Sequence, residues 1–147
     1  MRKEPAPPAR CTFEPGDWLR LAKCWHPVAR ACDIGPAPVK ATLLDDQLVI
    51  YRINDRVVVA RDVCPHRGVP LTLGFHDEYG IICPYHGLRF GEEGRCNRIP
   101  SSPDQPVPAK LNLINYAVEE RFGLIWTCLD FDPDNPVPLP TLPHWDD

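Results

Sequence analysis

Two short segments of the chain each place one cysteine and one histidine on a turn-prone sequence. The first is Cys64-Pro65-His66-Arg67-Gly68, and the second is Cys83-Pro84-Tyr85-His86-Gly87. Thiolate and imidazole are both strong metal ligands. The prolines restrict φ and the glycines permit sharp turns, so both segments can reach one metal centre. Two cysteines and two histidines in this arrangement match a [2Fe–2S] centre in which one iron takes the cysteines and the other takes the histidines.

A structural zinc site is the alternative that the same four ligands allow, because two cysteines and two histidines also bind Zn²⁺ tetrahedrally. Zinc modules usually pair cysteine with cysteine, or histidine with histidine, at short spacing. Each segment here mixes the two residue types. The mixed spacing favours the iron–sulfur centre and leaves zinc as the less favoured interpretation.

The two segments, with Leu88-Arg89-Phe90 after the second, resemble the Rieske family. The resemblance is closest to the N-terminal domain of ring-hydroxylating and vanillate O-demethylase-like oxygenases. Weaker support comes from Trp25-His26-Pro27-Val28-Ala29 and Phe122-Gly123-Leu124-Ile125-Trp126, and the resemblance spans roughly residues 18–129.

The resemblance implies a Rieske-type cluster in which Cys64 and Cys83 hold a buried iron. It implies that His66 and His86 hold the outer iron near solvent. The neighbouring residues that can adjust the cluster are Arg67, Gly68, Pro84, Tyr85, Gly87 and Leu88. Arg67 either caps its loop or tunes the cluster and meets an acidic partner. Tyr85 either packs over the cluster or hydrogen-bonds a ligand sulfur, and no residue of the chain is expected to be catalytic.

Imidazole ligands change the charge and the redox behaviour of such a cluster. Two neutral imidazoles in place of thiolates remove about two negative charges, which raises the reduction potential above that of all-cysteine clusters. A ligand histidine can also lose a proton, so we expect reduction and protonation to be linked. High-potential family members carry an extra cysteine in each loop and a serine after the second His-Gly, where this chain has Val69, Tyr85 and Leu88. The resemblance therefore predicts a potential near about −150 mV rather than about +300 mV.

Short apolar runs separated by turn residues must position the two segments. We expect strands at residues 39–44, 48–53, 57–60, 81–82, 88–90, 115–119 and 124–128. The expected turns lie at Asp45-Asp46, Asn54-Asp55, Gly91-Glu92-Glu93-Gly94 and Arg121-Phe122-Gly123. Nineteen prolines in 147 residues argue against long helices. We predict an all-β fold, a small antiparallel Rieske-type sandwich or barrel with a cluster-binding subdomain of two loops.

Composition divides the chain into three parts. Residues 1–14 contain three prolines and no hydrophobic period, which predicts a flexible N-terminal arm. Residues 15–130 form the predicted Rieske domain. Residues 131–147 are acidic and proline-rich, and they read as a linker or tail toward an absent catalytic or reductase domain.

Charge and hydropathy exclude two kinds of partner. Sixteen Lys and Arg against 20 Asp and Glu give a formal net charge of −4, which argues against nucleic acid. The chain has no apolar run long enough to span a membrane and no signal-peptide pattern at Met1, so we expect a cytoplasmic protein. Seven cysteines are an odd number, and in a reducing compartment metal ligation is a better explanation for some of them than disulfides.

The resemblance implies one-electron transfer in the oxidation or O-demethylation of aromatic compounds. A reductase or ferredoxin would donate the electron, and a mononuclear non-haem iron in an oxygenase catalytic domain would accept it. That iron needs two histidines and a carboxylate, and only His144 follows His86 in this chain. A free-standing Rieske ferredoxin, or the Rieske module of a fused reductase, is the alternative. The entry segment at residues 25–29 favours the oxygenase type.

Overall fold

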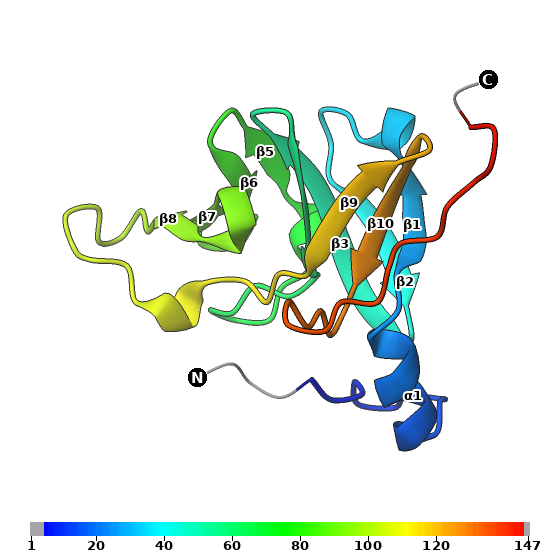
Figure 1. The fold of residues 1–147 in the computed structure, drawn as a ribbon. Helices are drawn as coiled ribbons and strands as arrows, with labels where there is room; N and C mark the ends of the chain where they lie inside the picture. The colour runs from blue at the N-terminus through cyan, green and yellow to red at the C-terminus, as the bar shows by residue number, and fades with distance from the viewer. Residues whose placement is uncertain (1–4, 146–147) are drawn as a thin grey trace.

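A computed structural model describes residues 5–145 of the protein, and these residues form three small antiparallel sheets with one α-helix (Figure 1). The first sheet has the order β1 (His26–Arg30), β10 (Leu124–Cys128), β9 (Ala117–Arg121). The second has the order β2 (Val39–Leu43), β3 (Asp46–Ile53), β4 (Arg56–Arg61). The third has the order β5 (Phe75–Asp77), β6 (Gly80–Ile82), β7 (Arg89–Phe90), β8 (Cys96–Arg98). Helix α1 is Pro15–Ala22, and the 3-10 helices are η1 (Ala31–Asp33), η2 (Leu71–Leu73), η3 (Glu92–Gly94) and η4 (Ala109–Leu111).

The predicted all-β class is confirmed, and the sheets do not close into a barrel. The expected strands of the second sheet and of the β9–β10 hairpin are present with small shifts of their ends. Strands β1, β5 and β8 were not predicted. They are three to five residues long and lack a clear apolar alternation, so only pairing with neighbouring strands defines them.

The first hairpin turn lies one residue earlier than predicted. Leu44 and Asp45 are the turn residues, with φ of 50° and 65°, and Asp46 already belongs to β3. Positive φ at both central residues is typical of a tight hairpin turn. Leu44 is buried there, and its carbonyl accepts the indole N–H of Trp18 at 2.9 Å. Packing against α1 therefore outweighs the turn preference of the two aspartates.

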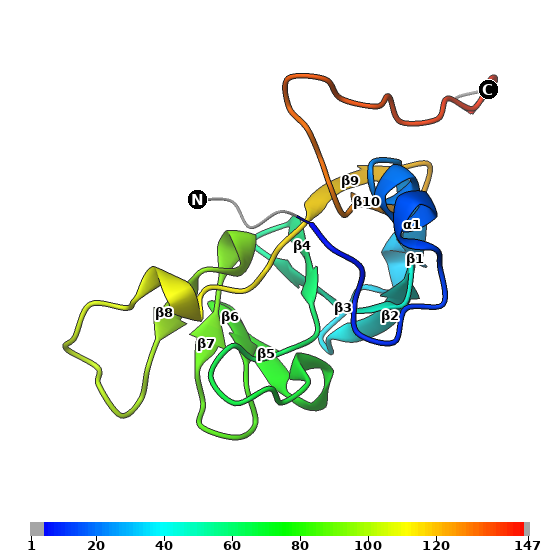
Figure 2. The ribbon, with the colours of Figure 1, turned by 90° about the horizontal axis from the view of Figure 1, so that it is seen from below.

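Strands β3 and β4 separate two hydrophobic cores. One face of these strands, with Leu48 and Val59, packs on Trp18 of α1 and Ile125 of β10. The other face, with Tyr51, packs on residues of the third sheet such as Phe90. Figure 2 shows the same arrangement from below, with β3 and β4 between β5–β8 and the β1–β9–β10 side. The third sheet thus packs on the second sheet. The Tyr51 hydroxyl adds a hydrogen bond between them, because it donates to the carbonyl of Gly91, the residue after β7, at 2.9 Å.

The segments outside the sheets also make specific contacts, although the division at residues 14 and 130 stays a prediction. Thr12 donates both its backbone N–H and its hydroxyl to Asp45, each at 2.7 Å. Toward the other end, the indole N–H of Trp25 donates to the carbonyl of Val137, and the Trp145 ring contacts Phe122. Residues 1–4 of the expected arm and 146–147 of the expected tail lie outside the described residues.

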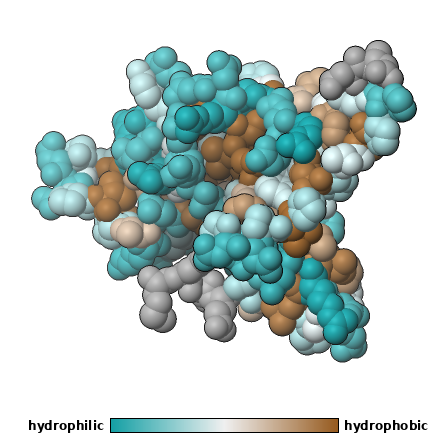
Figure 3. All heavy atoms as spheres, in the orientation of Figure 1, coloured by the Kyte–Doolittle hydropathy of each residue, from teal (hydrophilic) through white to brown (hydrophobic). Residues whose placement is uncertain are grey.

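The face shown in Figure 3 is mostly hydrophilic, with smaller hydrophobic areas between the polar atoms. Among the described residues, no helix has the length and apolar character needed to cross a membrane. Helix α1 has only eight residues, in line with the sequence expectation that long helices are absent.

Candidate metal centre

The first Cys/His segment lies in a loop that we call the first loop (residues 63–70), directly after β4 and Asp62. The backbone N–H of Cys64 donates to the carbonyl of Val69, and the N–H of Gly68 donates to the carbonyl of Cys64, both at 2.8 Å. Gly68 has a φ of +76°, which only glycine adopts without a steric cost. The chain therefore turns back on itself within six residues and presents His66 at the tip.

The second loop (residues 83–88) repeats this backbone pattern between β6 and β7. Cys83 N–H donates to the carbonyl of Leu88 at 2.9 Å, and Gly87 N–H donates to the carbonyl of Cys83 at 3.1 Å. Gly87 has a φ of +73°, and a Cβ there would lie 3.2 Å from a ring carbon of Pro100. Each loop thus has its glycine four residues after the cysteine, while the histidine comes two residues after it in the first loop and three in the second.

The structure brings the four predicted ligands together in two pairs. The rings of His66 and His86 meet edge to face with centroids 4.7 Å apart, and both histidines are exposed. Cys64 and Cys83 are each 2% exposed and belong to the core beneath the loops. Their thiols are near enough for a hydrogen bond between them. Sulfur is therefore presented from the inner side of the site and imidazole from the outer side.

Burial raises the pKa of the Cys64 thiol to about 11, and the neighbouring Cys83 sulfur acts in the same direction. Backbone N–H groups of His66 and Arg67 hydrogen-bond the Cys64 sulfur and act in the opposite direction, because they stabilise negative charge. A bound metal requires the thiolate and displaces the thiol proton. The loop backbone is thus arranged to stabilise a negatively charged sulfur at this position.

The paired arrangement fits a dinuclear cluster. In such a cluster each iron takes two ligands from the protein, so cysteines and histidines lie on opposite sides. A single Zn²⁺ would need its ligands around one point. Within residues 5–145, no group of three or more histidine, cysteine, aspartate or glutamate side chains is placed to hold one metal ion. The donor set present therefore fits a [2Fe–2S] cluster.

The six neighbouring residues singled out from the sequence have different surroundings. The Tyr85 ring packs on the His86 ring, with centroids 3.9 Å apart, and the side chain is 62% exposed. Leu88 is buried in the core under the loops, whereas Arg67 and Pro84 are exposed. The contact of Tyr85 is therefore with a histidine, and the expected roles of Arg67 and Tyr85 toward the cluster stay predictions.

Three residues that support the loops were not singled out from the sequence. The Asp62 side chain is buried and accepts the backbone N–H of Thr72 at 2.9 Å and its hydroxyl at 2.6 Å. Gly74 lies so close to β6 that a Cβ would overlap the carbonyl oxygen of Ile82. An acidic residue at the end of the apolar run 57–60 was the available signal for Asp62, while nothing in the local sequence indicates the contact of Gly74.

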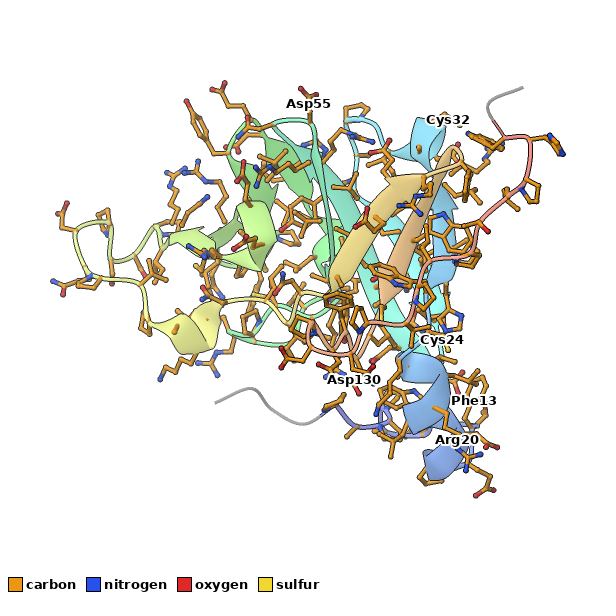
Figure 4. The ribbon with its side chains drawn as sticks, in the orientation of Figure 1. Phe13, Arg20, Cys24, Cys32, Asp55 and Asp130 are labelled. Carbon is orange, nitrogen blue, oxygen red and sulfur yellow. The ribbon has the colours of Figure 1, made fainter. Side chains whose placement is uncertain are left out.

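The remaining cysteines do not join the site. None of the seven cysteines forms a disulfide, and Figure 4 shows Cys24 beside α1 and Cys32 in η1, away from β5–β8. Cys11 packs beside the core next to α1, and Cys128 is buried at the end of β10. Cys96 is buried in β8.

Fold and site together define a small β protein in which two loops bring two cysteines and two histidines together. The chain belongs to the Rieske [2Fe–2S] domain family, whose model matches residues 24–116. Its cofactor is accordingly a Rieske-type [2Fe–2S] cluster. The predicted resemblance is thereby confirmed at the level of the family.

The chain is similar in sequence and in structure to parts of several demethylases and oxygenases. The chain is 40% identical over 118 residues to methylxanthine N1-demethylase NdmA of Pseudomonas putida, covering 75% of this chain and 33% of the demethylase. It is 36% identical over 121 residues to the vanillate O-demethylase oxygenase subunit of a Pseudomonas strain, covering 82% and 32%. A crystal structure of apo dicamba monooxygenase superposes with a TM-score of 0.77 at 34% identity, covering 86% of this chain and 40% of that one. The chain is thus similar to parts of demethylase and oxygenase proteins, and it spans about a third of the length of these curated relatives.

Proposed function

We propose that this chain transfers single electrons through a cluster held by Cys64, Cys83, His66 and His86. The observation that carries the proposal is the pairing of two buried cysteines and two exposed, contacting histidines on loops with the same backbone hydrogen bonds. The bound cluster supplies a one-electron carrier whose imidazole ligands raise its potential above that of all-cysteine clusters.

The chain shields one side of the site from water and leaves the other side open to a redox partner. The cysteines lie on the core formed with the third sheet, where residues such as Leu88 and Phe90 exclude water. The histidines are exposed, so a redox partner that contacts them lies near the cluster. The hydrogen bonds inside each loop hold the ligands in place, which limits the rearrangement that accompanies electron transfer.

The finer proposal concerns the larger protein in which such a domain works. A reductase or ferredoxin would supply the electron, and a mononuclear non-haem iron in an oxygenase catalytic domain would receive it. One observation supports this, namely that the relatives include an oxygenase subunit. The substrates proposed for the complete system are aromatic or methoxy-aromatic compounds, in line with the names of the relatives.

The alternative places the same cluster in a carrier, either a free-standing ferredoxin or a module of a reductase. One comparison favours it, since the chain is 35% identical over 118 residues to oxidoreductase NdmD of Pseudomonas putida and covers 20% of that protein. Both candidates use the same four ligands and differ only in the protein that receives the electron.

The test is visible absorption and EPR of the purified chain, first oxidised and then reduced with dithionite. We expect a reddish-brown protein with two iron atoms per chain and, after reduction, the low-average-g signal of mixed histidine and cysteine ligation. A colourless protein that contains zinc would overturn the electron-transfer proposal. Mixing the reduced protein with a separately purified oxygenase component, or with a catalytic domain encoded downstream, then distinguishes the domain from the carrier.

A further inference from the structure

The two loops are closed at their bases in different ways. The second loop runs between adjacent strands of one sheet, where Ile82 of β6 pairs with Arg89 of β7. The first loop connects two sheets, because it leaves β4, which pairs with β3, and leads to β5, which pairs with β6. No strand pairing therefore brings the ends of the first loop together.

A buried carboxylate takes the place of that pairing. Asp62 is 3% exposed, and its backbone N–H donates to the carbonyl of Gln47 on β3 at 2.8 Å. Its side chain accepts two hydrogen bonds from Thr72, on the far side of the first loop. One residue thus attaches the start of the loop to the second sheet and its end to η2.

We propose that Asp62 is the positioning residue for Cys64 and His66. The proposal rests on the proposed function, because it explains how the ligands of the first loop are placed relative to those of the second. A buried carboxylate is costly unless it is hydrogen-bonded, and an apolar side chain would avoid that cost. The carboxylate is useful here because it accepts the amide and the hydroxyl of one residue together, which fixes both the distance between the loop ends and their orientation.

The link continues from Thr72 to the second loop. Helix η2 ends where Gly74 N–H donates to the carbonyl of Leu71 at 2.9 Å. Gly74 then lies directly against the carbonyl of Ile82, the residue before Cys83. Asp62, Thr72 and Gly74 therefore form a continuous connection from the base of the first loop to the base of the second, and this connection sets how His66 meets His86.

The experiment compares two threonine hydroxyls that each donate one short side-chain hydrogen bond, the partly buried Thr72 and the buried Thr127. Thr72→Val removes the hydroxyl bond to Asp62, while Thr127→Val removes a 2.8 Å bond to the carbonyl of Ala117 in the first sheet. Thr72→Ser keeps the hydroxyl and serves as the conservative variant. Asp62→Asn removes the charge at the other end of the link, and the threonine variants carry the test if this one does not fold.

Two measurements separate positioning from general stability. The first is hydrogen exchange of the loop amides in the purified chain, which is measured without using the spectrum of the cluster. We expect Thr72→Val to speed exchange at Cys64 and Gly68 by about tenfold or more relative to Cys83 and Gly87, with Thr72→Ser restoring the wild-type pattern. Thr127→Val should leave the ratio between the two loops unchanged.

The second measurement is the EPR spectrum of the reduced cluster together with the rate at which a chelator removes the iron. Thr72→Val should shift the g values and speed iron loss about tenfold, whereas Thr127→Val should lower the melting temperature with a wild-type spectrum. Equal exchange at both loops and a wild-type spectrum in Thr72→Val would overturn the role of Asp62. A wild-type chain without a Rieske spectrum overturns the proposed function instead, and the exchange ratio still decides the role of Asp62.

Discussion

The two loops that carry the candidate ligands have the same internal hydrogen bonds but depend on different parts of the fold. The second loop is closed by main-chain pairing of β6 and β7, to which many different side chains are suited. The first is closed by the side chain of Asp62, which accepts hydrogen bonds from the backbone N–H and the hydroxyl of Thr72. A loop within a sheet can therefore tolerate substitutions at its base, whereas a loop between sheets depends on two particular residues.

The largest effect should come from the ligands, where the loops are expected to be equivalent. Replacement of either buried cysteine, as in Cys64→Ser or Cys83→Ser, should remove the cluster, since the buried iron would lose one of two protein ligands. Iron analysis and visible absorption measure the loss. Cys32→Ser is the matched control, because Cys32 is exposed in η1, and it should retain full iron content. Retention of the cluster in one of the two loop variants would break the expected equivalence.

The next effect concerns the contact that joins the two loops. Gly74→Ala places a Cβ against the backbone of Ile82, which cannot move without disturbing β6. We expect a loss of about 2–3 kcal/mol in the free energy of unfolding, measured by urea denaturation. Gly35→Ala is the control, because a Cβ there meets nothing within 4 Å and should change stability by less than about 0.5 kcal/mol. Equal stability of the two variants would contradict the tight contact.

A smaller difference in thermal stability is expected between the alanine variants of the two loop glycines, Gly68 and Gly87. Both have positive φ, so alanine at Gly68 or Gly87 costs about 1–2 kcal/mol through backbone strain. Only at Gly87 would the new Cβ also press on Pro100. The melting temperature should therefore be lower for Gly87→Ala than for Gly68→Ala. The opposite order would show that the 99–108 segment yields to the added methyl group.

The smallest expected effect is a pH dependence of stability that arises at Asp77, the last residue of β5. Burial raises the pKa of Asp77, but hydrogen bonds from the N–H groups of Tyr79 and Gly80 and the ion pair with Arg89 outweigh it, so the pKa lies below the ordinary 3.8. The resulting stability is present above pH 3.8 and is lost as the pH falls through the lower folded-state pKa. It is modest, because the side chain is 37% exposed.

Urea unfolding between pH 5 and pH 3 measures this contribution. The wild-type chain should lose stability more steeply than Asp77→Asn, which lacks the titrating group. Parallel curves for the two proteins would mean that Asp77 contributes nothing to the turn between β5 and β6.

Most of the fold could be predicted from local signals, and the four candidate ligands were singled out by their spacing. Strands β3 and β4 are short runs rich in Val, Ile, Leu and Tyr, and the Asn54-Asp55 turn has the residues that positive φ favours. Strand β5 could not be predicted, because Phe75 is 60% exposed and only pairing with β6 makes the segment a strand. Asp62 was missed for a related reason, since its partner Thr72 lies ten residues further along the chain.

The sequence by itself determined the chemistry of this protein, because residue type decides which atoms can bind iron and Pro and Gly decide where the chain can turn tightly. The arrangement of those atoms was decided only by the tertiary structure. Cysteine meets cysteine and histidine meets histidine because the second and third sheets pack face to face and bring two separate loops together. Such contacts depend on how distant segments pack, and no local pattern of residues specifies them.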